Sequence, residues 1–399
     1  MLISLPGTAD SDWSLLAAAT TRLAVPRVDV APEMHSFILH APLELLARAA
    51  LLPHVHVAAR ERARARIDAL VAEFERVRPR GDAEPAEFPS IAAASASLRQ
   101  ALADRDAQGA DAAAAWLDAR AATADIARAL APHALPALGA AGHANIYIGL
   151  LGRATRIGGL RSMLRPVAGA LVSDPAEPIV VPSTYGDETS TARLLSVLAD
   201  GGQRRRPLGF IAPLVRAAAR RGVLDALCAP GGAFAAPTRA PIELLRVAAQ
   251  AMLQGSIEYA AYGWTHCLTL AQGALRAGEW AGDVMAGSYV AATYIAAHVA
   301  TYTDKPLDLD YRPEPTPLGM NDAVHDSPSS AAAAAWHAPE HAVTVLATAA
   351  AVNHDAHRVK YTLACLEAAA EDPAAERLYL AAAAHLNAWW EAHPDDDPT

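Results

Sequence analysis

The sequence predicts an all-α protein, a large single-domain helical bundle with a metal site between its helices and with long loops. Alanine and leucine dominate, and apolar residues recur with the helical period almost throughout the 399 residues. Strand-like runs are few; the best, "EPIVVPS", is short and flanked by prolines, which suits an edge or an extended loop. Several histidines also lie inside the apolar helical patterns, where a metal site between helices would need them.

Helices are expected wherever the apolar period is sustained, and prolines at 42, 241 and 373 lie where helix starts tolerate them. The expected helices span residues 42–52, 57–77, 91–106, 110–131, 141–151, 189–200, 211–226, 242–255, 257–277, 280–302, 341–352, 356–370 and 374–391. Segments 171–187, 228–241 and 303–330 look irregular, and the last is long enough to serve as a lid or a partner surface. Because no polar linker interrupts the pattern, we expect one domain over residues 1–399, with its core in 30–393.

Composition excludes several classes of partner. Hydrophobic residues make up 53% and charged residues 19%, which is typical of a globular chain. The net charge of −10 without a basic tract argues against nucleic acid and anionic membranes. The longest uncharged run, 284–302, carries a serine, a histidine and several threonines, so we expect a buried core helix and no membrane span. The sequence shows no signal peptide and no cysteine framework, so the cytoplasm is the expected compartment. The sequence does not determine the oligomeric state, and a homodimer stays open.

The motifs for common cofactors and nucleophiles are absent. No G-x-S-x-G elbow, no Walker A loop and no G-x-G-x-x-G after a strand occurs in the sequence. Redox chemistry would therefore require a metal or a diffusible cosubstrate.

The chain contains 15 histidines, and five of them lie inside apolar helical patterns. They are His40, His143, His266, His298 and His357. One such histidine is usually a core residue with a single hydrogen bond. Imidazoles from several helices, however, are how helical bundles build metal sites, and imidazole suits iron, zinc, copper and nickel.

Lys360 is unusual because the 33 basic residues comprise 31 arginines and only two lysines, Lys305 and Lys360. An arginine keeps its proton in a protein, whereas a buried lysine can lose it. A neutral lysine can coordinate a metal, act as a base, or react with carbon dioxide to give a carbamate that binds metal as a carboxylate does. His357 and Lys360 share a helix face. The alternatives are that Lys360 extends to the surface or pairs with Asp355 or Glu367.

Four segments, in order along the chain, resemble the questin oxidase-like family. They are "LHAPLELLARAAL", "GHANIYIGLLGRA", "AYGWTHCLTLAQGAL" and "DAHRVKYTLACLEAAAEDPAAERLYLAAAAHLNAWW". The last resembles the family's D-x-H-x-x-K helix followed by an acidic break and a final helix. The first departs from the family's N-H-x-x-H-x-L-L pattern, because the second histidine is missing and Glu44 lies near its place; His35, His54 and His56 are therefore rivals of His40. Residues 162–241 resemble nothing in the family.

The resemblance implies a mononuclear non-heme iron oxygenase that cleaves rings of aromatic polyketides or anthraquinones oxidatively, by Baeyer–Villiger-like or dioxygenase chemistry. Carried over by position, the Fe(II) ligands are His40, His143, His266, His357 and Lys360, with Lys360 in carboxylated form. O2 and an aromatic molecule would be the substrates, and NADPH is the reductant if one is needed.

Further candidates lie near these ligands in the sequence. Aromatic residues at Tyr147, Tyr259, Tyr262, Trp264 and Tyr294 would line a substrate slot, although aromatic residues beside core helices are often plain packing.

Two carboxylates complete the predicted site. Asp355 is a candidate to orient His357 or the lysine, and Glu258, eight residues before His266, is a candidate acid or base or a solvated side chain. Two other functions stay open: a zinc or two-metal hydrolase that uses a carboxylated lysine, and a non-catalytic α-helical binding protein.

Overall fold

The computed structural model describes residues 10–27, 35–157, 162–173, 178–181, 211–223, 240–303, 305–314 and 327–393, and these residues form an all-α fold. The α-helices are α1 (Asp10–Leu23), α2 (His35–Leu51), α3 (Arg60–Glu75), α4 (Ile91–Asp104), α5 (Ala107–Arg120), α6 (Thr123–Ala134), α7 (His143–Ile157), α8 (Leu164–Ser173), α10 (Ile211–Arg220), α12 (Ala240–Gln254), α13 (Thr265–Ala281), α14 (Val284–Tyr302), α15 (Pro328–His337), α16 (Pro339–Val352), α17 (Ala356–Glu371) and α18 (Glu376–Ala392). Shorter turns of helix are η2 (Leu52–His54), η3 (Val57–Ala59), η4 (Ala140–Gly142), η5 (Ile257–Tyr259), η6 (Ala260–Trp264) and η8 (Pro373–Ala375). No β-strand occurs in these ranges; one isolated bridge joins Arg27 and Pro79.

The all-α prediction is confirmed, and several boundaries differ from the expected ones. Helix α2 begins seven residues before Pro42, so this proline lies inside the helix and not at its start. The helix expected over 110–131 is two helices, α5 and α6, because Ala121 and Ala122 adopt an extended backbone between them. The helix expected over 257–277 is a 3-10 turn, a π-helical turn and then α13.

Parts of the expected irregular and extended segments lie in the described ranges. Helix α8 occupies the beginning of segment 171–187, and α15 begins at the end of segment 303–330. Within "EPIVVPS", residues 178–181 are extended but form no strand, and the Ile179 amide donates to the Pro136 carbonyl (2.7 Å). The helix expected over 189–200, segment 228–239 and residues 315–326 of the predicted lid lie outside the described residues.

Helix α14 is the buried core helix that its uncharged sequence predicts. Its side chains are buried from Ala286 to Tyr302, and Asp283 caps its first turn by accepting from the Ala286 amide (2.9 Å). None of the helices in the described part of the chain combines the length and the apolarity that a bilayer crossing requires.

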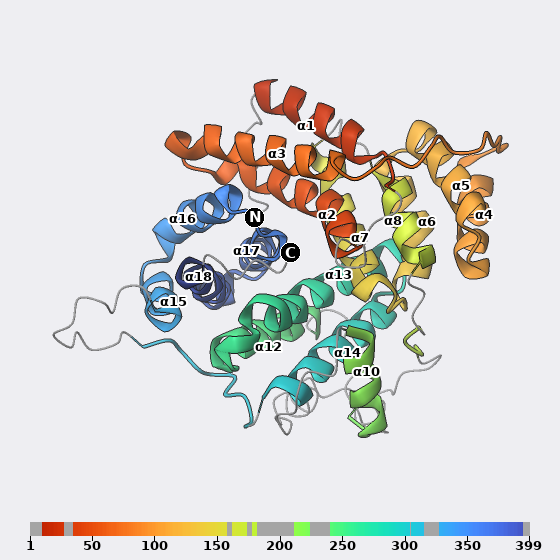
Figure 1. Cartoon of the computed structure of the whole chain (residues 1–399). Helices are drawn as coiled ribbons and strands as arrows, with labels where there is room; N and C mark the ends of the chain where they lie inside the picture. The colour runs from red at the N-terminus through yellow and green to blue at the C-terminus, as the bar shows by residue number, and fades with distance from the viewer. Residues whose placement is uncertain are drawn as a thin grey trace.

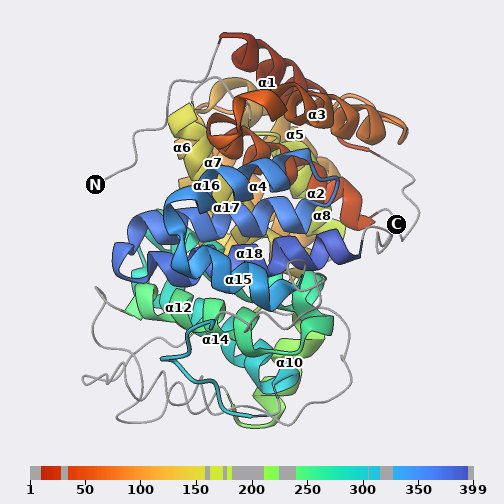
Figure 2. The same cartoon turned by 90° about the vertical axis from the view of Figure 1, so that its left-hand side faces the viewer.

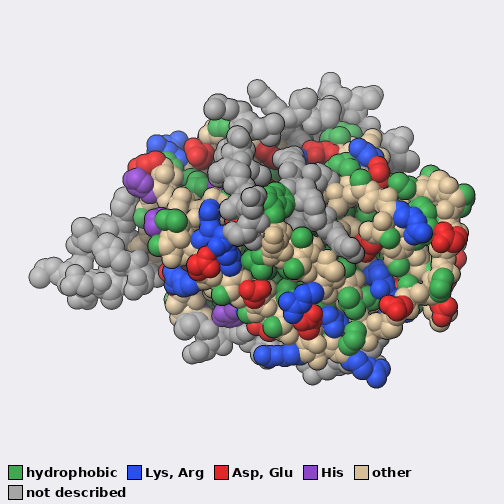
Figure 3. Space-filling view, turned by 90° about the horizontal axis from the view of Figure 1, so that it is seen from above, with side chains coloured by type: hydrophobic (Ala, Val, Ile, Leu, Met, Phe, Trp, Pro, Cys, Tyr) green, Lys and Arg blue, Asp and Glu red, His purple; other side chains and the backbone are tan. Residues whose placement is uncertain are grey.

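The helices surround a central group formed by α2, α7, α13 and α17 (Figure 1). Seen from the side, α15, α16, α17 and α18 lie next to one another, so the C-terminal quarter of the chain forms one wall of the molecule (Figure 2). Buried hydrophobic residues from α1 to α18 form one continuous cluster. On the face shown in Figure 3, the basic and acidic side chains of the described residues are interspersed.

Helices α7 and α13 approach each other closely at Gly273. A Cβ atom at this position would lie 2.6 Å from the carbonyl carbon of Asn145, which is closer than such atoms approach in proteins. Only glycine therefore permits this contact. The contact fixes the distance between the helices that carry His143 and His266.

Candidate metal centre

Four helices that are far apart in the sequence each contribute one buried histidine to the same place in the core. These residues, called here the histidine cluster, are His40 on α2, His143 on α7, His266 on α13 and His357 on α17. Each side chain is at most 8% exposed. Because polar groups so deeply buried are costly unless they bind something, their convergence requires a chemical explanation.

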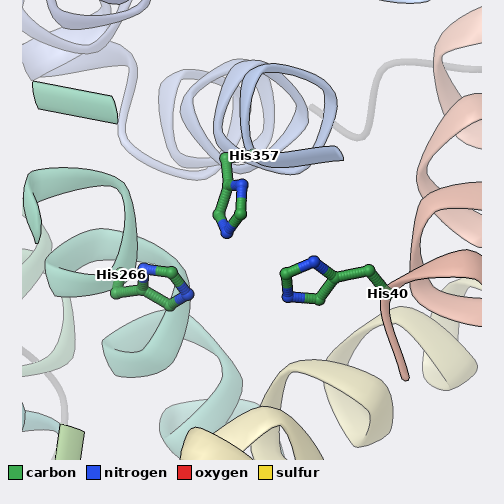
Figure 4. Close-up of side chains that lie close together, drawn as sticks. All are labelled: His40, His266 and His357. Atoms are coloured by element: carbon green, nitrogen blue, oxygen red, sulfur yellow. The ribbon is translucent and has the colours of Figure 1, made fainter. Parts of the chain in front are cut away.

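The four imidazole rings form a closed circle. Ring centroids lie 4.6 Å apart for His40 and His143, 5.4 Å for His143 and His266, 5.0 Å for His266 and His357, and 4.7 Å for His357 and His40. One nitrogen from each of His40, His266 and His357 lies within 4.8 Å of the others, so these three residues could hold a metal ion. Figure 4 shows their rings pointing toward a shared space from three different helices.

Backbone carbonyls orient two of the rings. Nδ1 of His143 donates to the Ala140 carbonyl (2.8 Å), and Nδ1 of His266 donates to the Tyr262 carbonyl. Because Nδ1 carries the proton in both rings, each Nε2 is an acceptor, as a metal ligand must be. The Nε2 atoms of His40 and His143 lie 2.7 Å apart.

Asp355 orients the third ring. Its carboxylate caps α17 by accepting from the amides of His357 (2.6 Å) and Arg358 (3.0 Å). The same carboxylate lies 3.4 and 3.5 Å from Nδ1 of His357, leaving Nε2 of His357 buried and without a hydrogen-bond partner among the described residues. Carboxylate–histidine pairs of this kind commonly hold metal ligands in position.

The surroundings keep the cluster neutral. Burial, followed by the charge of Lys360, lowers the pKa of His40 and of His143 far below the ordinary value. Burial and then the charge of His357 do the same to the pKa of His266, whereas Asp355 partly opposes the lowered pKa of His357. Neutral imidazole is the form that binds metals.

Lys360 lies one helical turn after His357 and is only 3% exposed, so it does not extend to the surface. Its Nζ atom has no hydrogen-bond partner among the described residues. Burial lowers the pKa of Lys360 to about 8, against the opposing charges of Asp355 and Glu44. An appreciable part of this amine is therefore neutral near neutral pH.

A buried ion pair on α2 fixes the loop that leads into α17. Arg48 binds Glu44 through Nε (2.7 Å) and donates to the carbonyls of Ala351 and Asn353 (2.6 Å each). These carbonyls lie at the end of α16 and just after it, a few residues before Asp355. Arg48 thus joins the helix that carries His40 to the segment that positions His357.

Unusual backbone precedes two of the four ligand candidates. Ala140, Ala141 and Gly142 all have positive φ, and the strained turn η4 delivers His143 at the start of α7. An alanine in this region costs about 1 kcal/mol or more. The π-helical turn η6 directly precedes α13 and supplies the carbonyl that holds His266. Both features are typical of functional sites.

Of the five aromatic residues predicted to line a substrate slot, Tyr262 is the one whose ring contacts the cluster in the described part of the chain. Tyr262 lies edge-on to His357, with centroids 4.9 Å apart. Tyr147 is buried and donates to the Ser162 carbonyl (2.6 Å), and Trp264 donates to the Ser256 carbonyl (3.2 Å). The hydroxyl of Tyr294 accepts from Asn145 (3.4 Å).

Tyr259 and the carboxylate candidate Glu258 lie away from α13. Tyr259 stacks on Tyr302 with centroids 4.4 Å apart. Glu258 is exposed on η5, because the π-helical turn separates it from α13 and the expected continuous helix face does not form. Its role as an acid or base stays a prediction.

The described rivals of His40 for the first ligand position lie outside the histidine cluster. His54 is half-buried on η2, and His56 caps η3 by accepting from the Ala58 amide (3.3 Å). The side chain of His35 lies outside the described part. His298 is buried on α14, with its ring 5.9 Å from Tyr302.

Two neighbours of the site, Arg48 and Trp390, were not predicted from the sequence. Arg48 was not considered, although an arginine in the apolar run "LELLARAALL" is the kind of signal that identified Lys360. Trp390 packs edge-on against Tyr262, with centroids 5.9 Å apart, and extends the aromatic surface beside His357. No sequence signal connects Trp390 on α18 with Tyr262.

Comparison of the chain with models of known protein families, with curated proteins and with solved structures finds no match.

Proposed function

We propose that this protein is a mononuclear non-heme iron oxygenase that cleaves an aromatic, quinone-type ring with O2. The observation that carries the proposal is the circle of four buried imidazoles with the Lys360 amine one helical turn away. The order of motifs that resembles the questin oxidase-like family agrees with it, and the family itself stays a proposal.

The residues fit a divalent metal ion. Nε2 of His266 is an acceptor, because Nδ1 of that ring donates to the Tyr262 carbonyl, and Nε2 of His357 is buried without a hydrogen-bond partner in the described part of the chain. Nε2 of His143 lies 2.7 Å from Nε2 of His40, so a metal ligand at His143 would first have to give up this contact. A bound cation would satisfy these atoms, and imidazole donors suit iron among several metals. Iron bound here would supply the electrons that activate O2.

Lys360 would supply the anionic ligand that the four neutral imidazoles lack. Its neutral amine can attack carbon dioxide: an Nζ–C bond forms, one C=O electron pair moves onto oxygen, and a proton leaves for solvent. The product is a carbamate with a single negative charge. Such a group offers metal-binding oxygens at the end of a chain longer than that of aspartate or glutamate.

Tyr262 and Trp390 support an aromatic substrate. They form an edge-to-face pair beside His357, and Tyr262 is only half-buried. An aromatic ring could pack on this surface and lie close to the cluster. If both oxygen atoms enter the product, no reductant is needed; if only one enters, NADPH or an equivalent must provide two electrons to convert the other to water.

The carboxylates near the cluster favour an oxygenase over a hydrolase. In many metal-dependent hydrolases, a carboxylate beside the metal acts as the base for the metal-bound water. Glu44 is paired with Arg48, and Asp355 caps α17 and holds His357. In the described ranges, the two carboxylates whose charges act on Lys360 are therefore already engaged.

The test is metal content combined with oxygen consumption. Protein purified without oxygen and supplied with Fe(II) should retain about one iron per chain and consume O2 when a polyhydroxylated anthraquinone is added. Zinc that resists chelation, without O2 consumption, would support the hydrolase. Protein that retains no metal under these conditions would support a binding protein.

A further inference from the structure

A narrow cavity lined by Lys360 lies between the helices of the histidine cluster. Its volume is about 20 Å³, enough for about one water-sized molecule. Its walls come from α7, α13 and α17, the helices that carry His143, His266 and His357.

The cavity lies along the contact between α7, α13 and α17, which we call the seam, and it extends outward from the cluster. On α7 it is lined by Ile146 and Leu150, which follow His143 by three and seven residues. On α13, Thr269 and Gly273 follow His266 by the same intervals, and on α17 Lys360 and Ala364 follow His357 in the same way. Residues three and seven apart share a helix face, so the three ligand faces and the cavity walls are continuous.

Arg276 marks the outer end of this seam. It lies ten residues after His266 on α13, its side chain is 23% exposed, and it pairs with Glu371 on α17 and with Glu279. An exposed ion pair of this kind contributes little to stability and can open readily. The seam therefore runs from a surface ion pair, past Gly149, to Lys360.

We infer that this seam is the route by which carbon dioxide reaches Lys360. The inference rests on the proposed function, because it assumes that Lys360 forms a carbamate. Apart from Arg276 and the amide of Gln272, the walls are mostly apolar, which suits an uncharged gas molecule. The cavity is far too small for an aromatic ring, so the ring substrate must approach the cluster from another side.

Gly149 is the position from which the route can be blocked. A Cβ atom there would lie 3.5 Å from the Cα atom of Gly273 and 3.7 Å from the Cβ atom of Arg276, which are ordinary contacts. Gly149→Ala should therefore be accommodated, and Gly149→Val should occupy more of the cavity. Gly169 on α8, where an added Cβ meets nothing within 4 Å, provides matched control variants.

The experiment measures how fast labelled carbon enters the carbamate in the intact chain as isolated. The protein is transferred into buffer equilibrated with ¹³CO2, and the carbamate carbon is followed by ¹³C NMR. We expect incorporation to slow about three-fold in Gly149→Ala and about ten-fold in Gly149→Val, with the same final amplitude; these factors correspond to about 0.7 and 1.4 kcal/mol in the barrier. In the control variants Gly169→Ala and Gly169→Val, the rate should stay within about two-fold of wild type, which corresponds to about 0.4 kcal/mol.

The outcomes separate the route from the carbamate itself. If the wild type is labelled and both Gly149 variants are labelled at its rate, the route is wrong and the carbamate stands. Absence of label in the wild type would overturn both. Should Gly149→Val fail to fold, Gly149→Ala decides, and Arg276→Ala, which widens the outer end, should label at least as fast as wild type.

Discussion

His266 on α13 and His298 on α14 have the same local hydrogen bond and the same burial but different ring neighbours. Each follows a tyrosine by four residues, and each donates from Nδ1 to that tyrosine's carbonyl. Each is 1% exposed, and the two helices pack against each other. His266, however, faces three other imidazoles, whereas the ring near His298 is that of Tyr302.

The difference shows that neither burial nor the local hydrogen bond identifies a metal ligand. Burial alone lowers the pKa of His298, to about 4, with the Tyr294 carbonyl opposing the shift. At His266 the charges of neighbouring cluster residues add to burial. The neighbours of the ring, and not its own helix, distinguish the candidate ligand His266 from the core histidine His298.

The largest expected effect is on bound iron, and it differs between His266 and His298. His266→Ala should lower bound iron at least about ten-fold, because it removes a ligand from the cluster. His298→Ala leaves a cavity of the same size in the neighbouring helix and should keep the wild-type metal content. Both variants are assayed by elemental analysis after dialysis against a weak chelator; equal iron in the two would contradict the assignment of His266.

The second prediction compares the two lysines. Lys360→Arg keeps the positive charge but removes the amine that can form a carbamate, so iron retention should fall about ten-fold or more. Lys305→Arg, at an exposed position, is the control and should behave as wild type. Circular dichroism should show equal helicity in both. Full iron content in Lys360→Arg would exclude Lys360 as a ligand.

The third prediction concerns acid stability at His298. Its folded pKa of about 4 lies below the value of about 6.5 in an unfolded chain, so the unfolded state binds more protons between these pH values. The associated stability is fully present above pH about 6.5 and is lost as the pH falls toward 4, by roughly 3 kcal/mol.

The substitution His298→Leu should remove this dependence of stability on pH. The free energy of unfolding of His298→Leu, relative to wild type, should therefore rise by roughly 2–3 kcal/mol between pH 7 and pH 4. Urea titrations at several pH values measure it, and His341→Leu, at an exposed position, serves as the control. A constant difference across this range would mean that His298 does not titrate as a buried neutral group.

The smallest effect compares two helix caps. Asp355 and Asp283 both cap a helix through their side chains, but only Asp355 also contacts a cluster histidine. Asp355→Asn should weaken iron binding about ten-fold, whereas Asp283→Asn should leave it unchanged. Chelator competition measures the affinity, and thermal unfolding should show similar small losses in both. Unchanged iron affinity in Asp355→Asn would remove its role in orienting His357.

From the sequence, the fold class and the four histidines of the cluster could be predicted more fully than the residues that surround them. Helical periodicity is a local signal, and the residues His40, His143, His266 and His357 were recognisable as polar interruptions in it. The choice between His40 and its rivals depends on tertiary contacts, which no local pattern encodes. The sequence left His35, His54 and His56 open beside His40, and the structure places His40 in the circle.

The predicted aromatic slot shows the limit of sequence proximity. Trp264 precedes His266 by two residues, and such residues point to different sides of a helix. Tyr294 belongs to the helix of His298, which lies outside the circle. Trp390, from a distant helix, reaches Tyr262 through tertiary packing, so no local spacing could have predicted it.

The spacing of the four histidines along the chain has a consequence for biosynthesis. They lie at positions 40, 143, 266 and 357, so the circle cannot close on a nascent chain until α17 has left the ribosome. Up to that moment the earlier histidines can bind metal only as incomplete, weaker sites. On the proposed function, iron loading would be a late event that follows the long-range packing of α17, and metal content would report how much of the chain has completed folding.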